Sequence, residues 1–114
     1  MKLGDVAGII EGKVVGGQSN IEKEINSAFA SDLMSDVLTT EAEGLLLITG
    51  LANMQTIRTA EMAEIKGIVF VRNKKPTQEM IRVAEENQIV LIESASSMYL
   101  VSGKLYQAGV KALF

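Results

Sequence analysis

The side chains best suited to bind a ligand lie in a short basic segment, residues 72–75, which is followed by Pro76. Proline is favoured in the first turn of a helix, where its missing N–H costs nothing, so we expect a helix to begin at Pro76. Cations beside the free N–H groups of a helix N-terminus attract anions. The segment therefore predicts a site for an anionic group anchored by Arg72, Lys74 and Lys75. The alternative is a solvated basic loop without a ligand.

Arg58 is a second candidate cation, on a helix expected after the apolar run of residues 44–49. A guanidinium facing the same crevice would bind a phosphate or carboxylate through two hydrogen bonds. The alternative is a surface ion pair with Glu61 or Glu41, and the sequence favours the ion pair.

Polar side chains after other strand-like segments are candidates to orient a ligand. Asp32 and Asp36 belong to two Ser-Asp pairs four residues apart, so on a helix they would share one face and could approach a cation or a ligand. The alternative is that Ser31 is the N-cap of this helix and that Asp32 is a favourable charge in its first turn. The remaining candidates are Thr49, Asn53 and Ser94.

The chain contains no cysteine and no histidine. This composition excludes disulfides, thiolate catalysis and cysteine-based zinc sites, and it removes the commonest general base and metal ligand. Ser94, Ser96 and Ser97 follow an apolar run, but no motif places a base beside them, so N-capping of the last helix is their favoured role. We expect no catalytic residue, no metal and no cofactor. An enzyme using carboxylates and lysines alone is the alternative.

Charge and hydropathy limit the partners. A net charge of −3 argues against nucleic acid, whose phosphates require a basic face. No apolar run approaches the ~20 residues that cross a bilayer, so no membrane partner is expected. The first residues carry a charge at Asp5 and no long apolar core, which is unlike a signal peptide. The expected compartment is the cytoplasm.

Three apolar runs, at residues 44–49, 67–72 and 89–93, are expected to position the candidate side chains. Runs without polar alternation are typical of strands buried on both faces. Amphipathic segments between them indicate right-handed crossovers and a mainly parallel sheet. Because ligands bind such sheets outside the carboxyl ends of the strands, the candidate loops are expected to gather at one edge.

The rest of the chain completes a single α/β layered domain over residues 1–114, with helices flanking the sheet. Leu3, Val6, Ala7 and Ile10 mark one face of a first helix, and strands are expected at residues 13–16 and 25–30. A short helix should open at Ser31-Asp32, and another should follow a cap at Asn53. The last helix carries Val101 and Leu105 on its apolar stripe and should stop at Gly109.

Four segments of the chain resemble a known family: Ala30-Ser-Asp-Leu-Met-Ser-Asp36, residues 49–61, Gly67-Ile-Val-Phe-Val-Arg-Asn-Lys-Lys-Pro76 and residues 97–106. Their order and spacing resemble the DRTGG domain over essentially the whole chain. The resemblance is closest to the small stand-alone versions found beside iron-only hydrogenase and related redox genes. It implies the fold of the non-catalytic N-terminal domain of HPr kinase/phosphorylase. Many members carry a Thr-Gly-Gly-like element where this chain has Arg72-Asn73-Lys74.

The resemblance implies a non-catalytic regulatory or ligand-sensing domain that forms a homodimer. With the basic segment, it predicts binding of a small anionic metabolite or nucleotide at the carboxyl edge of the strands. The alternative is a protein–protein adaptor linked to a redox or hydrogenase enzyme partner without small-molecule binding. An adaptor predicts an exposed apolar patch, whereas the aromatic C-terminus could instead pack on the sheet. The patch residues would be Met98, Tyr99, Tyr106 and Phe114.

Overall fold

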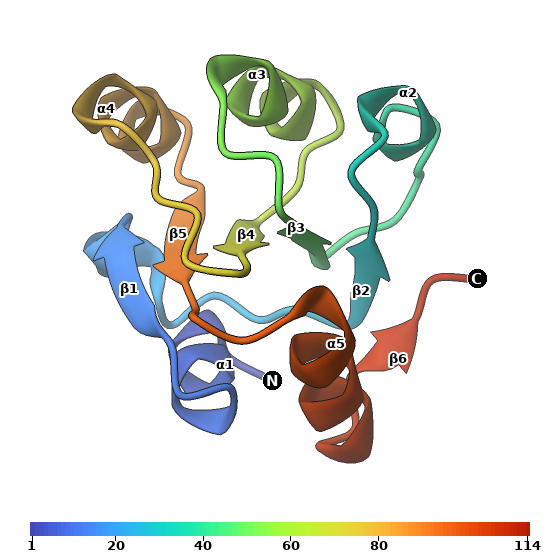
Figure 1. The fold of residues 1–114 in the computed structure, drawn as a ribbon. Coiled ribbons are helices and arrows are strands. Elements are labelled where there is room, and N and C mark those ends of the chain that lie inside the picture. Colours follow the sequence, from blue (N-terminus) through green and yellow to red (C-terminus); the bar gives the residue numbers. More distant parts are fainter.

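The computed structural model describes residues 1–114 and contains one six-stranded sheet (Figure 1). Its strands are β1 Lys13–Gly16, β2 Ser27–Ala30, β3 Leu45–Thr49, β4 Gly67–Phe70, β5 Val90–Glu93 and β6 Lys111–Ala112. They lie in the order β1-β5-β4-β3-β2-β6. Strand β1 is antiparallel to β5, and every other neighbouring pair is parallel. The mainly parallel α/β fold predicted from the sequence is therefore confirmed.

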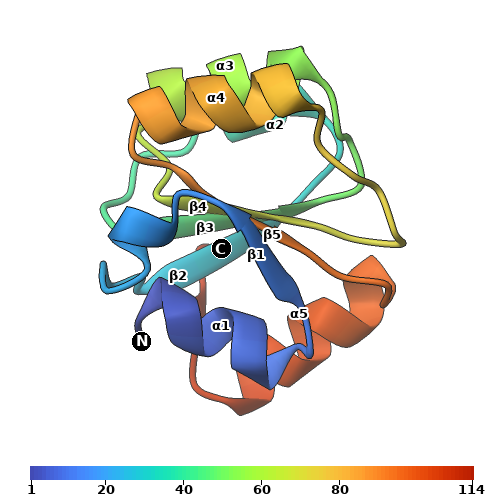
Figure 2. The ribbon, with the colours of Figure 1, turned by 90° about the vertical axis from the view of Figure 1, so that its left-hand side faces the viewer.

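Helices cover both faces of this sheet. They are α1 Leu3–Ile9, α2 Met34–Val37, α3 Met54–Met62, α4 Gln78–Glu86 and α5 Met98–Gln107, with a short 3-10 turn η1 at Gln18–Asn20. Helices α2, α3 and α4 form one layer, and α1 and α5 form the other (Figures 1 and 2). No helix combines the length and apolar character that crossing a bilayer requires.

The central strands are buried from both sides, which explains their unbroken apolar sequence. All five residues of β3 are buried. Leu46 and Ile48 belong to the core beneath α1 and α5, whereas Leu45 and Leu47 belong to the core beneath α2, α3 and α4. Because successive side chains of a strand point to opposite faces, a strand between two cores needs an apolar residue at every position.

The connections cross from one face of the sheet to the other between the loops after β4 and β5, and this point is the switch of direction in the sheet. Strands β2, β3, β4 and β5 follow one another across the sheet, and the crossovers α2, α3 and α4 all lie on one face (Figure 1). After β5 the chain turns to α5 on the opposite face and returns to the far edge as β6. The loops after β4 and β5 therefore leave adjacent strands toward opposite faces, which is where α/β proteins commonly bind ligands.

Two predicted helix starts are wrong. Helix α4 begins at Gln78 rather than Pro76, because Thr77 is its N-cap and accepts a hydrogen bond from the Met80 N–H at 3.2 Å. Helix α2 begins at Met34 rather than at Ser31-Asp32. Ser31 Oγ instead accepts from the Leu33 N–H at 3.0 Å in a local turn before the helix.

Strand β6 was not predicted from the sequence. This strand has two exposed residues, so it shows neither an apolar run nor an alternation. Its backbone pairs with that of β2, Ser27 opposite Lys111 and Ala28 opposite Ala112. Strand β6 is thus held by the open edge of β2 rather than by burial of its own side chains.

Candidate functional site

The carboxyl ends of four adjacent parallel strands bring four loops to one edge of the sheet. The loops follow β2, β3, β4 and β5, and together with Thr49 at the end of β3 they contain seven of the eight side chains proposed from the sequence. The eighth, Arg58, lies within α3. The seven divide into a cluster beside β2 and β3 and a cluster beside β4 and β5.

In the first cluster, Asp32 joins the ends of β2 and β3. Its Oδ1 accepts hydrogen bonds from Thr49 Oγ1 at 2.8 Å and from the Gly50 N–H at 2.7 Å. Thr49 is fully buried, and its Oγ1 also accepts from the Leu51 N–H at 3.2 Å. Asp32 therefore lies outside any helix and does not share a helix face with Asp36. Its carboxylate fixes the loop after β3.

Asn53 is the N-cap of α3, as predicted. Its Oδ1 accepts from the Thr56 N–H at 3.0 Å and lies 3.2 Å from Thr56 Oγ1. Thr56 Oγ1 donates to the Leu51 carbonyl at 2.7 Å, so the loop and the first helical turn are tied together. Helix α3 has no acidic residue in its first turn. Its N-terminal N–H groups therefore face no opposing carboxylate on their own helix.

In the second cluster, the loop after β4 lies across the end of β5. The Arg72 N–H donates to the Ser96 carbonyl at 2.8 Å, and the Asn73 N–H donates to the Ser94 carbonyl at 3.0 Å. Arg72 and Asn73 have φ values of 56° and 61°. Glycine adopts this left-handed backbone without strain, whereas Arg72 and Asn73 adopt it at a cost.

Ion pairing leaves two cations unneutralised in this loop. Lys75 Nζ lies 3.0 Å from Glu93 Oε1, so its charge is balanced within the chain. Arg72 and Lys74 are exposed and form no ion pair. Nearby, Ser94 is buried, and its Oγ accepts from the Ser96 N–H at 3.1 Å.

The two helices that begin beside these cations differ in charge. Helix α4 carries Glu79 in its first turn, which opposes an anion there. Helix α5 has Ser97 as N-cap and no acidic residue in its first turn. An anion beside Arg72 and Lys74 is therefore favoured on the α5 side of the loop.

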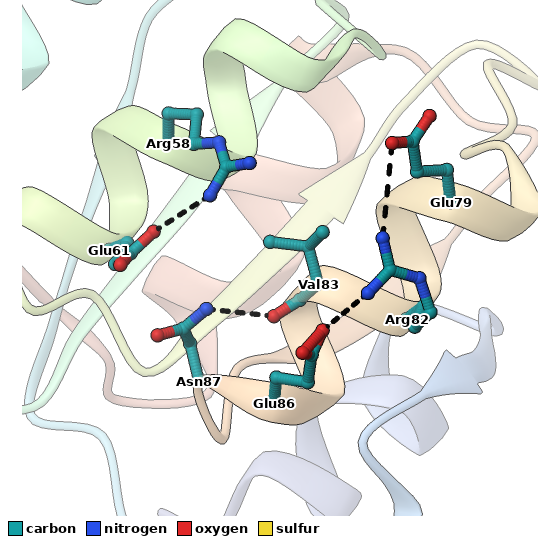
Figure 3. Close-up of polar contacts among 7 residues, drawn as sticks. All are labelled: Arg58, Glu61, Glu79, Arg82, Val83, Glu86 and Asn87. Carbon is teal, nitrogen blue, oxygen red and sulfur yellow. Dashed lines mark hydrogen bonds and ion pairs between the residues drawn. The ribbon is translucent and has the colours of Figure 1, made fainter.

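Arg58 belongs to a different surface. Its Nη1 lies 3.6 Å from Glu61 Oε2, three residues further along α3 and so further from the carboxyl edge (Figure 3). The adjacent α4 carries a similar network, in which Arg82 pairs with Glu79 at 3.9 Å and with Glu86 at 2.6 Å. Of the two interpretations, the structure gives the ion pair with Glu61.

A second candidate site is an apolar groove of about 490 Å³ between α5, the edge strand β6 and its neighbour β2. Tyr99, Tyr106 and Phe114 line it and are 90%, 70% and 87% exposed. The patch expected for an adaptor is thus present, except that Met98 is partly buried against the core. Phe114 also meets Phe29 edge to face, with ring centroids 5.6 Å apart.

The groove could be anticipated only in part. Its aromatic residues stand out in the sequence, but one wall is formed by β6, which carries no recognisable pattern. Elsewhere on the surface, no group of three or more acidic side chains lies close enough to hold a metal ion.

Fold and site together define an α/β domain with a basic loop at the switch of direction in a parallel sheet. Residues 5–108 match the model of the DRTGG domain, and the chain belongs to this family. No curated protein sequence matches it significantly. A similar solved structure is that of the CBS and DRTGG domains of the regulatory region of Clostridium perfringens pyrophosphatase, complexed with the activator diadenosine tetraphosphate. The TM-score is 0.74 at 13% identity, over 94% of this chain and 46% of the other, so this chain spans about half its length.

Proposed function

We propose that this protein is a non-catalytic regulatory domain that senses a small phosphate-bearing metabolite or nucleotide and works as a homodimer. The site would be the loop after β4, where it crosses the end of β5. The observation that carries the proposal is the pair of unneutralised cations, Arg72 and Lys74, at this switch of direction. Regulatory function is supported by the family and by the regulatory region that contains the pyrophosphatase DRTGG domain.

The chemistry of this edge suits a phosphate group. The Arg72 guanidinium offers two parallel N–H donors, and Lys74 adds a mobile positive charge. The first N–H groups of α5 lie beyond Ser97 and add a positive helix end. A nucleotide is a reasonable probe because the pyrophosphatase region was solved with diadenosine tetraphosphate.

The test is a ligand titration with ATP, AMP, diadenosine tetraphosphate and inorganic phosphate at two salt concentrations. Binding is measured by thermal unfolding, because a ligand that binds only the folded state raises the free energy of unfolding by ~2.7 kcal/mol at a hundredfold excess over its Kd. We expect at least one probe to raise Tm, and the rise should shrink at high salt.

The site is tested with the double variant Arg72→Gly/Lys74→Gln. Glycine keeps the left-handed loop conformation while removing the cation. The matched control is Lys23→Gln/Lys66→Gln, which removes the same charge from two lysines that form no ion pair and lie outside the carboxyl edge. The proposal expects binding to be lost in the first variant and kept in the control. Equal loss in both variants, or no binding of any probe, would contradict it.

A protein–protein adaptor for a redox-enzyme partner is the second candidate function. The exposed apolar groove beside α5 favours it, because such patches mark protein contacts. It predicts no response to any of the four probes. The adaptor function also requires that nothing else occupies the groove when the redox-enzyme partner binds.

A further inference from the structure

Helix α5 presents a stripe that its own chain covers only in part. The stripe consists of Tyr99, Ser102, Gly103 and Tyr106, which lie on one helix face at spacings of three, four and seven residues. All four line the apolar groove. The opposite face of α5 buries Val101 and Leu105 in the core.

The stripe reads the same in both directions, with a large residue at each end and two small residues between. An isologous two-fold contact accommodates such a pattern, because residue i meets residue j and j meets i, so like residues would meet at each position. With the axis between Ser102 and Gly103, two antiparallel copies of α5 would place Tyr99 against Tyr106 of the second copy. Ser102 would face Gly103 of the second copy. The two small residues would allow the helices to approach closely at the centre.

Gly103 in this stripe has no explanation within one chain. Glycine is a poor residue for a helix interior, and a Cβ added at Gly103 would meet nothing within 4 Å. Gly8 in α1 is equally open, but no exposed aromatic residues flank it.

The exposed aromatic side chains supply a large part of the area that a dimer needs. Tyr99, Tyr106 and Phe114 are 90%, 70% and 87% exposed, and aromatic side chains bury about 150–250 Å² each, so together they offer roughly 500 Å². A stable interface buries ~800 Å² per partner. The residues around Lys111 line the same groove and add to this area.

We propose that a second copy of this chain docks on this face, with the two α5 helices antiparallel and crossing at Ser102 and Gly103. Each groove then receives aromatic side chains of the other copy. The inference rests on the homodimer of the proposed function and names its interface. The basic loop after β4 contributes no residue to the groove lining.

The first test is the oligomeric state by sedimentation equilibrium over a range of concentrations. The variant Gly103→Gln places a long side chain at the crossing, whereas Gly8→Gln makes the same change on an equally open helix position. We expect a wild-type dimer, a dimer dissociation constant raised tenfold or more by Gly103→Gln, and no change in Gly8→Gln. Circular dichroism checks that both variants keep the wild-type fold.

The second test determines the relative orientation of the two α5 helices by disulfide cross-linking. The chain has no cysteine, so only the introduced cysteines can form a disulfide. In the antiparallel arrangement the two copies of residue 99 are ~10 Å apart along the helix axis. A disulfide needs Cα atoms within ~7 Å, so Tyr99→Cys alone should not cross-link. A mixture of Tyr99→Cys and Tyr106→Cys proteins should form mixed disulfides. Cross-linking of each variant with itself would overturn the antiparallel arrangement.

The outcomes separate this interface from the proposed function. A dimer that Gly103→Gln leaves intact would overturn the interface but not the homodimer. A wild-type chain that is monomeric at every concentration would overturn both. Neither result affects the phosphate titration, which depends on Arg72 and Lys74.

Discussion

Thr49 Oγ1 donates a hydrogen bond to Asp32 Oδ1 at 2.8 Å and thereby joins the carboxyl ends of β2 and β3. Asp32→Ala leaves this fully buried threonine without its acceptor, and such a loss costs about 1–3 kcal/mol. We expect Asp32→Ala to lower the free energy of unfolding by this amount. Urea denaturation followed by circular dichroism measures it.

A double-mutant cycle isolates the pair. In a Thr49→Val background the buried hydroxyl is gone, so Asp32→Ala should cost about 1 kcal/mol less than in the wild type. Asp36→Ala is the matched control, because Asp36 is exposed and its carboxylate forms no hydrogen bond, so its loss should stay within ~0.5 kcal/mol. Equal costs for Asp32→Ala in both backgrounds would show that the bond contributes nothing.

Gly17 and Gly109 both have positive φ, 75° and 102°, but only Gly17 is crowded. A Cβ at Gly17 would lie 2.6 Å from the Ile89 carbonyl oxygen and 2.9 Å from Val90 Cα, both backbone atoms, whereas at Gly109 it would meet nothing within 4 Å. Gly17→Ala should therefore lower the free energy of unfolding by about 2 kcal/mol or more. Gly109→Ala should cost only the backbone strain, about 1 kcal/mol. Equal losses in chemical denaturation would rule out the close approach at β5.

The fold was largely predictable because burial dictates residue type in its central strands. Leu45 to Thr49 are all buried between two cores, so no polar residue interrupts them before the strand ends. Strand β6 follows no such constraint, since Lys111 and Ala112 are exposed and held by backbone pairing. Only knowledge of the open edge of β2 would have revealed it.

The candidate site was less predictable, because residue type does not reveal a side chain's partner. Asp32 could be interpreted as a charge in the first turn of a helix. Its Oδ1 instead accepts hydrogen bonds from Thr49 and Gly50, which are seventeen and eighteen residues away. Pro76 suggested a helix start, but Thr77 offered a side-chain cap one residue later. Arg58 allowed two interpretations, and proximity to Glu61 decided between them.

Arg72 holds a left-handed backbone, φ 56°, that costs a non-glycine residue ~1–2 kcal/mol. Arg72→Gly should therefore raise the free energy of unfolding, by about 1 kcal/mol after the greater entropy of unfolded glycine is subtracted. Lys74 is also exposed but does not have positive φ, so Lys74→Gly should lower stability. Urea denaturation of both variants without ligand tests this prediction. A lower free energy of unfolding for Arg72→Gly would show that Arg72 holds no backbone strain.

Gly103→Ala should change stability in opposite directions at low and high protein concentration. In the separated chain, alanine improves the α5 helix by about 1 kcal/mol, because its Cβ meets no neighbour within 4 Å. In the proposed dimer, the same methyl group separates the helices at their crossing and weakens association, which removes stability gained by mass action. Denaturation curves should therefore place Gly103→Ala above the wild type in dilute solution and closer to it, or below it, as concentration rises. Gly8→Ala, at an equally open position on α1, should remain above the wild type by a constant amount. A constant gain for Gly103→Ala as well would mean that no second copy approaches this part of α5.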